Sequence, residues 1–494
     1  MSYLRESIDK YLDQTLLERF DELHIPGMGL AVIADNEIKA LRGYGYRDLE
    51  NKLLVDKDTM FAIGSSSKAF TAAILAQLVD EGRLNWTDRV RDIIPEFRLQ
   101  DPIAEAEMNI IDLQCHRGGM SRADVAWAFL PKVDRHDLLK RMRHFPVEFP
   151  FRTRFSYNNY MWLAAGIVAE RVTGKSWEEL VTERIFKPLG MRANCSVDEM
   201  AKLENRAIGY ADENGSYQRL DYHNIDAMGP AGSINASIED YARWLLLNTN
   251  KGKFNDQQII SEENMEQVFH PHTPITPDND VLQYLGLEDL VELKSFGYGL
   301  GWFHYTYKDH RILAHGGNID GFSAWLMFMP DDGIGAAVLT NADQNLIHHS
   351  IVFEIFDRLL GVGQKPWVEK GIQYYHQMKA MLEDAKGSLL ALQAFDTHPS
   401  HPLEDYCGTY QHPGYGELVI EMEDGLLVGS IWEREVTFKH FHYDTFMMHL
   451  EIPFPETDLP VTFHFAITGL VKSLSMPLEE GLAEIEFVRI PEEE

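Results

Sequence analysis

FAIGSSSKAFTAAILAQLVDEG, residues 61–82, is the stretch that decides the fold. After its three serines, apolar residues recur at helical spacing, the alanines favour a helix, and Gly82 is a C-terminal stop signal. The pattern therefore predicts one helix that the serines open. A helix N-terminus presents unpaired backbone N–H groups and the positive end of the macrodipole, which together stabilise an anion. A serine hydroxyl at this end has an oxyanion site beside it.

Ser65 and Lys68 are three residues apart, which places their side chains on one helix face with Cβ atoms about 5–6 Å apart. To accept the Ser65 proton near neutral pH, Lys68 needs a pKa lowered from ~10.4 to roughly 7–8. Burial among apolar neighbours can supply such a shift. The alternative is that the serines only cap the helix and Lys68 is solvated. Spacing does not decide between the two, because Ser7 and Lys10 repeat it in an ordinary amphipathic pattern.

Composition limits the class of protein. The 494 residues allow two or three domains, and 45% hydrophobic with 25% charged residues indicate a soluble globular chain without a membrane span. The N-terminus lacks an apolar signal region, and the three cysteines lack metal-ligand spacing, so we expect a cytoplasmic protein without bound metal. A net charge of −32 repels phosphate backbones and anionic lipids, although it could also serve solubility alone. We expect no nucleic-acid or membrane partner.

The order of elements predicts an α+β fold. Residues 28–46 form a hairpin pattern around Asp35-Asn36, and a long helical block follows the Ser65 helix. Strands are then expected over 299–305, 311–315, 322–329 and 334–341, before a helix at 346–360. Sequential strands of this kind imply an antiparallel sheet, which the helices can cover.

A second domain is predicted after a break. Residues 363–402 form a helical connector, and short, closely spaced strands without helices follow it. This pattern predicts a small antiparallel β-barrel over 403–494, behind a first domain over 1–362.

Three polar motifs occur in order along the first domain. Ser65-x-x-Lys68 opens a helix, Tyr157-x-Asn159 precedes a buried helix, and His315-Gly316-Gly317 closes a strand. Chance copies of the second and third motifs occur at 222–224 and 412–414. Only the first set has all three motifs in one order with the matching secondary structure.

With these motifs, residues 8–360 resemble the penicillin-binding, class C-type serine β-lactamase superfamily, and most closely its D-aminopeptidase and esterase-like members. The resemblance implies a β-lactamase/transpeptidase-like fold, with an antiparallel sheet flanked by helices plus a helical subdomain. It implies a serine hydrolase that needs no cofactor. The residues after 400 resemble the lipocalin-like β domain of some peptidases of this group.

The resemblance also implies roles for single residues. Ser65 would be the nucleophile of an acyl-enzyme, with Lys68 and Tyr157 as a shared proton shuttle whose base stays open. Asn159 would orient Lys68 and contact the substrate. The substrate-binding and oxyanion wall would comprise His315, Gly317 and the backbone N–H groups of Ser65 and Asn318.

Departures from the pattern bear on the substrate. β-Lactamases of the superfamily usually carry Lys-Thr-Gly where this chain has His315-Gly316-Gly317, and no Ser-Asp-Asn triplet occurs. A histidine carries charge for only part of the time near neutral pH, so a fixed cation for a substrate carboxylate is missing. We therefore predict hydrolysis of small amides or short peptides, including D-amino-acid peptides. A carboxylesterase or β-lactamase-type hydrolase, and a penicillin-binding sensor without turnover, are the alternatives. The sequence is compatible with a homo-oligomer.

Overall fold

The computed structural model describes residues 8–130, 132–213, 216–276, 279, 293–343, 347–450 and 457–491. The chain forms two compact units. The first comprises Met1–Phe97, Ile103–Gly119 and Phe151–Met378, and the second Arg98–Pro102, Met120–Pro150 and Lys379–Glu494. The predicted domain boundaries at 362 and 402 stay a prediction. None of the described helices combines the length and the apolar character that a membrane crossing requires.

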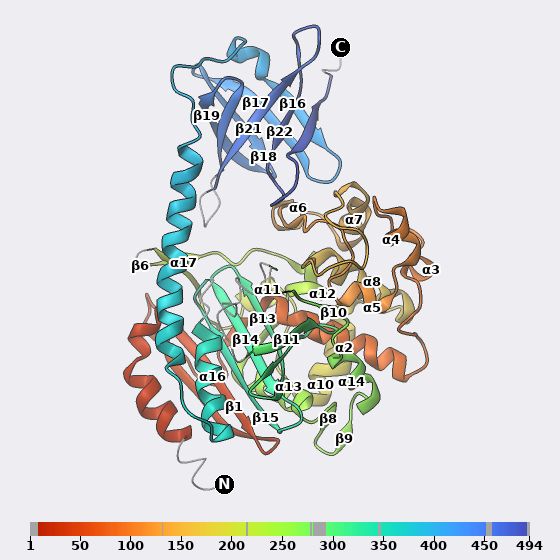
Figure 1. Ribbon diagram of the computed structural model, residues 1–494, viewed down its shortest axis with the longest axis vertical. Helices are drawn as coiled ribbons and strands as arrows, with labels where there is room; N and C mark the ends of the chain where they lie inside the picture. The colour runs from red at the N-terminus through yellow and green to blue at the C-terminus, as the bar shows by residue number, and fades with distance from the viewer. Residues whose placement is uncertain are drawn as a thin grey trace. The chain divides into compact units, whose positions relative to one another are not determined.

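The first unit contains a nine-stranded sheet, in the order β10-β11-β12-β13-β14-β15-β1-β2-β3. All of its neighbouring strands run antiparallel, which confirms the predicted α+β class. Figure 1 shows β1, β13, β14 and β15 side by side. The strands are β1 (Gly27–Ala34), β2 (Glu37–Asp48), β3 (Leu53–Leu54), β10 (Thr273–Pro274), β11 (Leu293–Tyr298), β12 (Phe303–Tyr307), β13 (His310–Ile319), β14 (Phe322–Met329) and β15 (Ile334–Thr340).

Helices cover both faces of this sheet at its centre. Every position of β14 and β15 is buried, as expected for strands enclosed on two sides. A Cβ on Gly335 would lie 2.9 Å from Leu245 of helix α13 (Ile238–Thr249). Trp325, which pairs with Val338 on the other face of β15, lies with its ring 3.8 Å from that of His349 in α16 (Ile347–Leu360). The two helices therefore pack on opposite faces.

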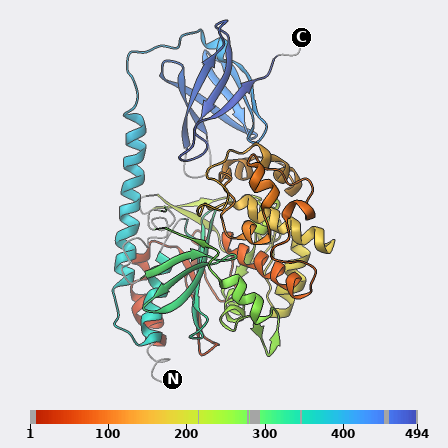
Figure 2. The ribbon, with the colours of Figure 1, turned by 45° about the vertical axis from the view of Figure 1, so that its right-hand side comes forward.

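The predicted serine helix is α2 (Ser67–Asp80), and it lies at the centre of the helical part of this unit. Its residues are buried from Ser67 to Leu78, and it packs on α8 (Asn159–Thr173) and α12 (Gly229–Gly232). Figure 2 shows the orange and yellow helices gathered beside the green strands of the sheet. Gly82 has φ +66°, which fits the predicted stop signal.

Shorter elements complete the described chain. The helices are α3 (Val90–Ile93), α4 (Pro102–Glu107), α5 (Ile110–Gln114), α6 (Asp124–Phe129), α7 (Arg135–Arg141), α9 (Trp177–Val181), α10 (Lys187–Leu189), α11 (Val197–Ala201), α14 (Glu262–Phe269) and α17 (Trp367–Leu390). Two-stranded pairs are β4 (Met60–Ala62) with β7 (Asn235–Ser237), β5 (Gly209–Glu213) with β6 (Ser216–Leu220), and β8 (Lys253–Phe254) with β9 (Gln257–Gln258).

Two predicted strands differ from those observed. The strand expected over 299–305 begins only at Phe303, because Gly299 to Trp302 form the turn between β11 and β12, with Gly301 at φ +82°. The strand expected to close at His315 continues to Ile319. Its glycines pair in register with Trp325 and Ala324 of β14, so backbone pairing carries β13 past them.

The second unit contains the predicted β-barrel, which is closed and built from eight strands. Figure 1 shows it in blue. Its interior is filled with side chains, among them the mutually packed rings of Tyr410, Phe446 and Phe463. The strands are β16 (Gly408–His412), β17 (Gly416–Glu423), β18 (Leu426–Ile431), β19 (Arg434–His442), β20 (Thr445–Leu450), β21 (Thr457–Phe465), β22 (Val471–Met476) and β23 (Ile485–Arg489).

The segment 120–150, with α6 and α7, belongs to the barrel unit although its neighbours in sequence belong to the first. Phe129 stacks on Trp432, and Phe145 meets the ring of Tyr415 edge-on. The backbone N–H of Ala123 donates to the buried Glu479 at 3.1 Å. These contacts are long in sequence, so a division of the chain by composition does not reveal them.

Candidate active site

The start of α2 separates the three consecutive serines. Gly64–Ser66 form a single 3₁₀ turn before the helix. Ser66 accepts a hydrogen bond from the Tyr241 hydroxyl at 2.8 Å, and Ser67 accepts one from the Ile234 N–H at 3.1 Å. Both are buried, whereas Ser65 is half-buried. Of the three hydroxyls, that of Ser65 alone is therefore placed to meet a substrate.

Lys68 is completely buried, with 0% of its surface exposed. Its Nζ lies 2.8 Å from the Ser65 Oγ and donates to the Ala231 carbonyl at 2.9 Å. The reading of Lys68 as a solvated residue is therefore wrong. Burial of an ammonium group disfavours its charged form, which is the shift that a lysine base requires.

Tyr157 faces the same amine from the loop before α8. Its ring centroid lies 4.8 Å from the Lys68 Nζ. The imidazole of His116 stacks on this ring at 4.2 Å, and its Nδ1 accepts the backbone N–H of Asn158 at 3.0 Å. His116, a lone histidine that the sequence places in a glycine turn, thus holds the tyrosine loop.

Asn159 is the first residue of α8 and does not belong to the preceding loop. The helix begins there because the Asn158 side chain caps it, accepting the Met161 N–H at 3.0 Å. Asn159 is 7% exposed, and its predicted contact with Lys68 stays a prediction.

The oxyanion wall depends on a close approach of two backbones. A Cβ on Gly317 would lie 2.1 Å from the Ile63 carbonyl oxygen and 2.5 Å from the Ser65 nitrogen. A Cβ on Gly64 would lie 3.1 Å from the Asn318 nitrogen. The structure therefore brings the two predicted donors, the N–H groups of Ser65 and Asn318, to one place.

His315 closes the opposite wall as a neutral ring. It is 2% exposed, its Nδ1 lies 2.7 Å from the Gly316 carbonyl, and its Nε2 lies 2.8 Å from the Tyr298 hydroxyl. Burial, together with the positive charge of Lys68, lowers the pKa of His315 to about 3. The expectation that this histidine is charged part of the time near neutral pH is therefore wrong.

Two participants escaped the sequence motifs. Tyr298 ends β11, and Ala231 acts through its backbone carbonyl on α12. A carbonyl carries no residue signature, and Tyr298 meets His315 only because β11, β12 and β13 are neighbours in the sheet. A buried polar ring directly before the glycines of a turn is the one local signal for Tyr298.

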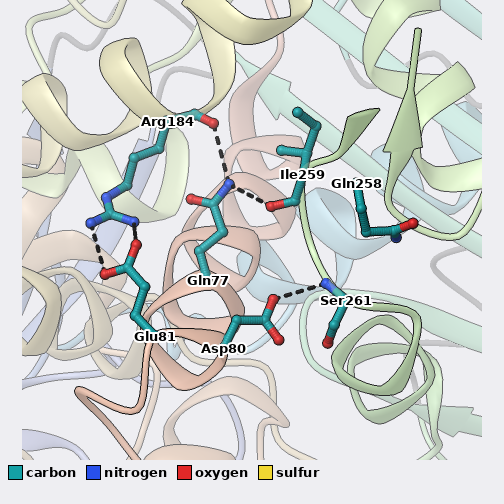
Figure 3. A pocket seen from close by; sticks show the side chains of 7 residues that line it. All are labelled: Gln77, Asp80, Glu81, Arg184, Gln258, Ile259 and Ser261. Carbon is teal, nitrogen blue, oxygen red and sulfur yellow. Dashed lines mark hydrogen bonds and ion pairs between the residues drawn. The ribbon is translucent and has the colours of Figure 1, made fainter. Parts of the chain in front are cut away.

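A separate surface pocket lies at the other end of α2 (Figure 3). Its polar groups bond to one another: Arg184 pairs with Glu81, the Gln77 amide donates to the carbonyls of Arg184 and Ile259, and Asp80 accepts the Ser261 N–H. The remaining lining residue is Gln258. This pocket contains no nucleophile paired with a base.

Comparisons with known proteins agree with this geometry. The family described as Beta-lactamase matches residues 12–349, and a domain of unknown function, DUF3471, matches residues 393–489. The chain is 28% identical to an unguisins hydrolase of Aspergillus violaceofuscus, over 96% of this chain and 89% of that protein.

Solved structures resemble the fold. One is the octameric penicillin-binding protein homologue from Pyrococcus abyssi, with TM-score 0.61 and 19% identity over 97% of this chain and 99% of that one. Another is a D-stereospecific amidohydrolase from Streptomyces, with TM-score 0.52 and 23% identity over 65% of this chain and 90% of that one. The family match spans more than half of the sequence and includes all three polar motifs. The chain thus belongs to the Beta-lactamase family and is a serine hydrolase.

Proposed function

We propose that this enzyme hydrolyses small amides and short peptides, including D-amino-acid peptides, through an acyl-enzyme on Ser65. The observation that carries the proposal is the 2.8 Å contact between the Ser65 Oγ and the fully buried Nζ of Lys68. It pairs a reachable hydroxyl with an amine whose surroundings favour the neutral, proton-accepting form.

The chemistry divides into two steps. The Ser65 oxygen attacks the substrate carbonyl while its proton passes to Lys68 or Tyr157, and the N–H groups of Ser65 and Asn318 stabilise the oxyanion. Collapse of this intermediate breaks the bond to the leaving group, which takes up the proton. Water then attacks the acyl-enzyme, gives its proton to the same shuttle and releases the acid, so Ser65 regains its hydroxyl.

The relatives support the choice of substrate. One is named for its hydrolysis of unguisins, and a structural neighbour is a D-stereospecific amidohydrolase. Both names describe hydrolases, and the second describes amide cleavage on substrates of D configuration.

The test compares Ser65→Ala and Lys68→Ala with the parent enzyme on D-alanine and L-alanine p-nitroanilide. We expect each substitution to reduce kcat/KM by about 10⁴-fold or more, with unchanged circular dichroism and melting temperature for Ser65→Ala. Lys10→Ala is the matched control, because Lys10 belongs to the second Ser-x-x-Lys pattern and is exposed. Activity retained in Ser65→Ala would exclude the acyl-enzyme. Turnover of p-nitrophenyl esters without either anilide would assign the enzyme to the esterases.

A further inference from the structure

The wall formed by His315 and Tyr298 has a definite arrangement of protons. The Gly316 carbonyl can only accept a hydrogen bond, so the His315 Nδ1, 2.7 Å away, carries the ring proton. The Nε2 then has a lone pair, and the Tyr298 hydroxyl donates to it at 2.8 Å. Burial raises the pKa of Tyr298 well above its usual value, so the phenol keeps its proton.

This pair has no donor left for a substrate. The N–H of His315 is used by Gly316 and the O–H of Tyr298 by His315, so the remaining polar atom, the phenol oxygen, can only accept. The surroundings are aromatic: the Phe303 ring lies 4.8 Å from Tyr298 and 5.6 Å from His315. On its other side, the Tyr298 ring lies 4.6 Å from His116.

The nearby cation does not compensate. Lys68 has no exposed surface, and its Nζ contacts the Ser65 hydroxyl and the Ala231 carbonyl. A carboxylate brought against this wall would lose water and meet only acceptor atoms and ring faces, which is unfavourable.

We propose that the His315–Tyr298 pair makes the enzyme select substrates whose leaving group carries no carboxylate next to the scissile bond. This inference rests on the proposed acyl-enzyme function. The favoured substrates are peptides without a free C-terminus at that position, such as C-terminally blocked or cyclic peptides, and esters of uncharged alcohols. His315 is the specificity residue, and Tyr298 positions it.

Two matched substrate pairs test the selection. D-Alanyl-D-alanine is compared with D-alanyl-D-alanine amide, and the ester D-alanyl-D-lactate with D-alanyl-D-lactamide; release of the leaving group is followed by mass spectrometry. Within each pair only the carboxylate changes. We expect kcat/KM to be about ten- to a hundredfold higher for the uncharged member, the range of a charge-assisted hydrogen bond that is not made.

The variants His315→Lys and His315→Gln separate charge from shape. We expect His315→Lys to narrow or reverse the preference, and His315→Gln to keep it, because only the lysine adds a cation. Equal rates within both pairs, or a preference for the carboxylate in the parent enzyme, would overturn the inference and leave the hydrolase function intact. This comparison needs no variant to fold. Failure to release product from any of these substrates and from p-nitrophenyl esters would instead overturn the proposed function, and this inference with it.

Discussion

At the scale of the residue, the site is defined by which buried hydroxyls have partners. Tyr298 and Tyr305 lie on neighbouring strands and are both buried, yet only Tyr298 has a hydrogen-bond partner among the described residues. Tyr298→Phe leaves the His315 Nε2 as a buried acceptor without a donor. We expect the free energy of unfolding to fall by about 1–3 kcal/mol, measured by urea denaturation of the full chain.

Tyr305→Phe is the matched control for this prediction. It removes a hydroxyl that makes no hydrogen bond within the described part of the chain, so we expect stability to change by less than about 0.5 kcal/mol or to rise slightly. An equal loss in both variants would show that the Tyr298 hydroxyl contributes packing alone and does not hold His315.

At the scale of the element, the site depends on how closely strand β13 passes the turn before α2. In Gly317→Ala the new methyl group would overlap the Ile63 carbonyl and the Ser65 nitrogen, both of which are backbone atoms. The strand and the turn must separate, which displaces both oxyanion donors. We expect kcat/KM on the best anilide or ester substrate to fall by at least about 10²-fold, the cost typical of one lost oxyanion donor.

Gly232→Ala, in the nearby helix α12, provides the comparison. A Cβ there would have its nearest neighbour, the Ile225 side chain, at 3.5 Å, which is an ordinary contact. We expect this variant to retain activity within about threefold and to be slightly more stable, because alanine restricts the unfolded chain. If Gly317→Ala were as active as Gly232→Ala, the close approach would have no part in catalysis.

The same scale shows what sequence can predict. The helix of residues 67–80, the hairpin of β1 and β2 and the Ser65–Lys68 contact follow from local periodicity and spacing, which act over a few residues. Tyr298 and the Ala231 carbonyl do not, because they reach the site through strand order and helix packing. The neutral state of His315 is also not local, since its burial and the charge of Lys68 come from distant segments.

At the scale of the whole molecule, the barrel unit is completed by residues 120–150, which are inserted between parts of the first unit. Glu479 is central to this assembly. It is 6% exposed and accepts hydrogen bonds from the Ala123 N–H and the Tyr415 hydroxyl. Burial raises the pKa of Glu479 above its ordinary value of 4.5. The folded unit therefore holds a proton at this carboxyl more tightly than the unfolded chain does.

This shift predicts how stability depends on pH. The contribution of Glu479 is fully present below pH 4.5 and is lost as the pH rises through the raised folded-state pKa, because the buried carboxylate must then carry charge. In Glu479→Gln this loss disappears, so urea unfolding of the full chain between pH 4.5 and pH 7.5 should depend less on pH than in the parent protein. Glu480→Gln, at the exposed next position, should keep the parent's dependence. An unchanged pH dependence in Glu479→Gln would mean that the carboxyl titrates normally and that the contact with Ala123 does not hold the segment 120–150 to the barrel.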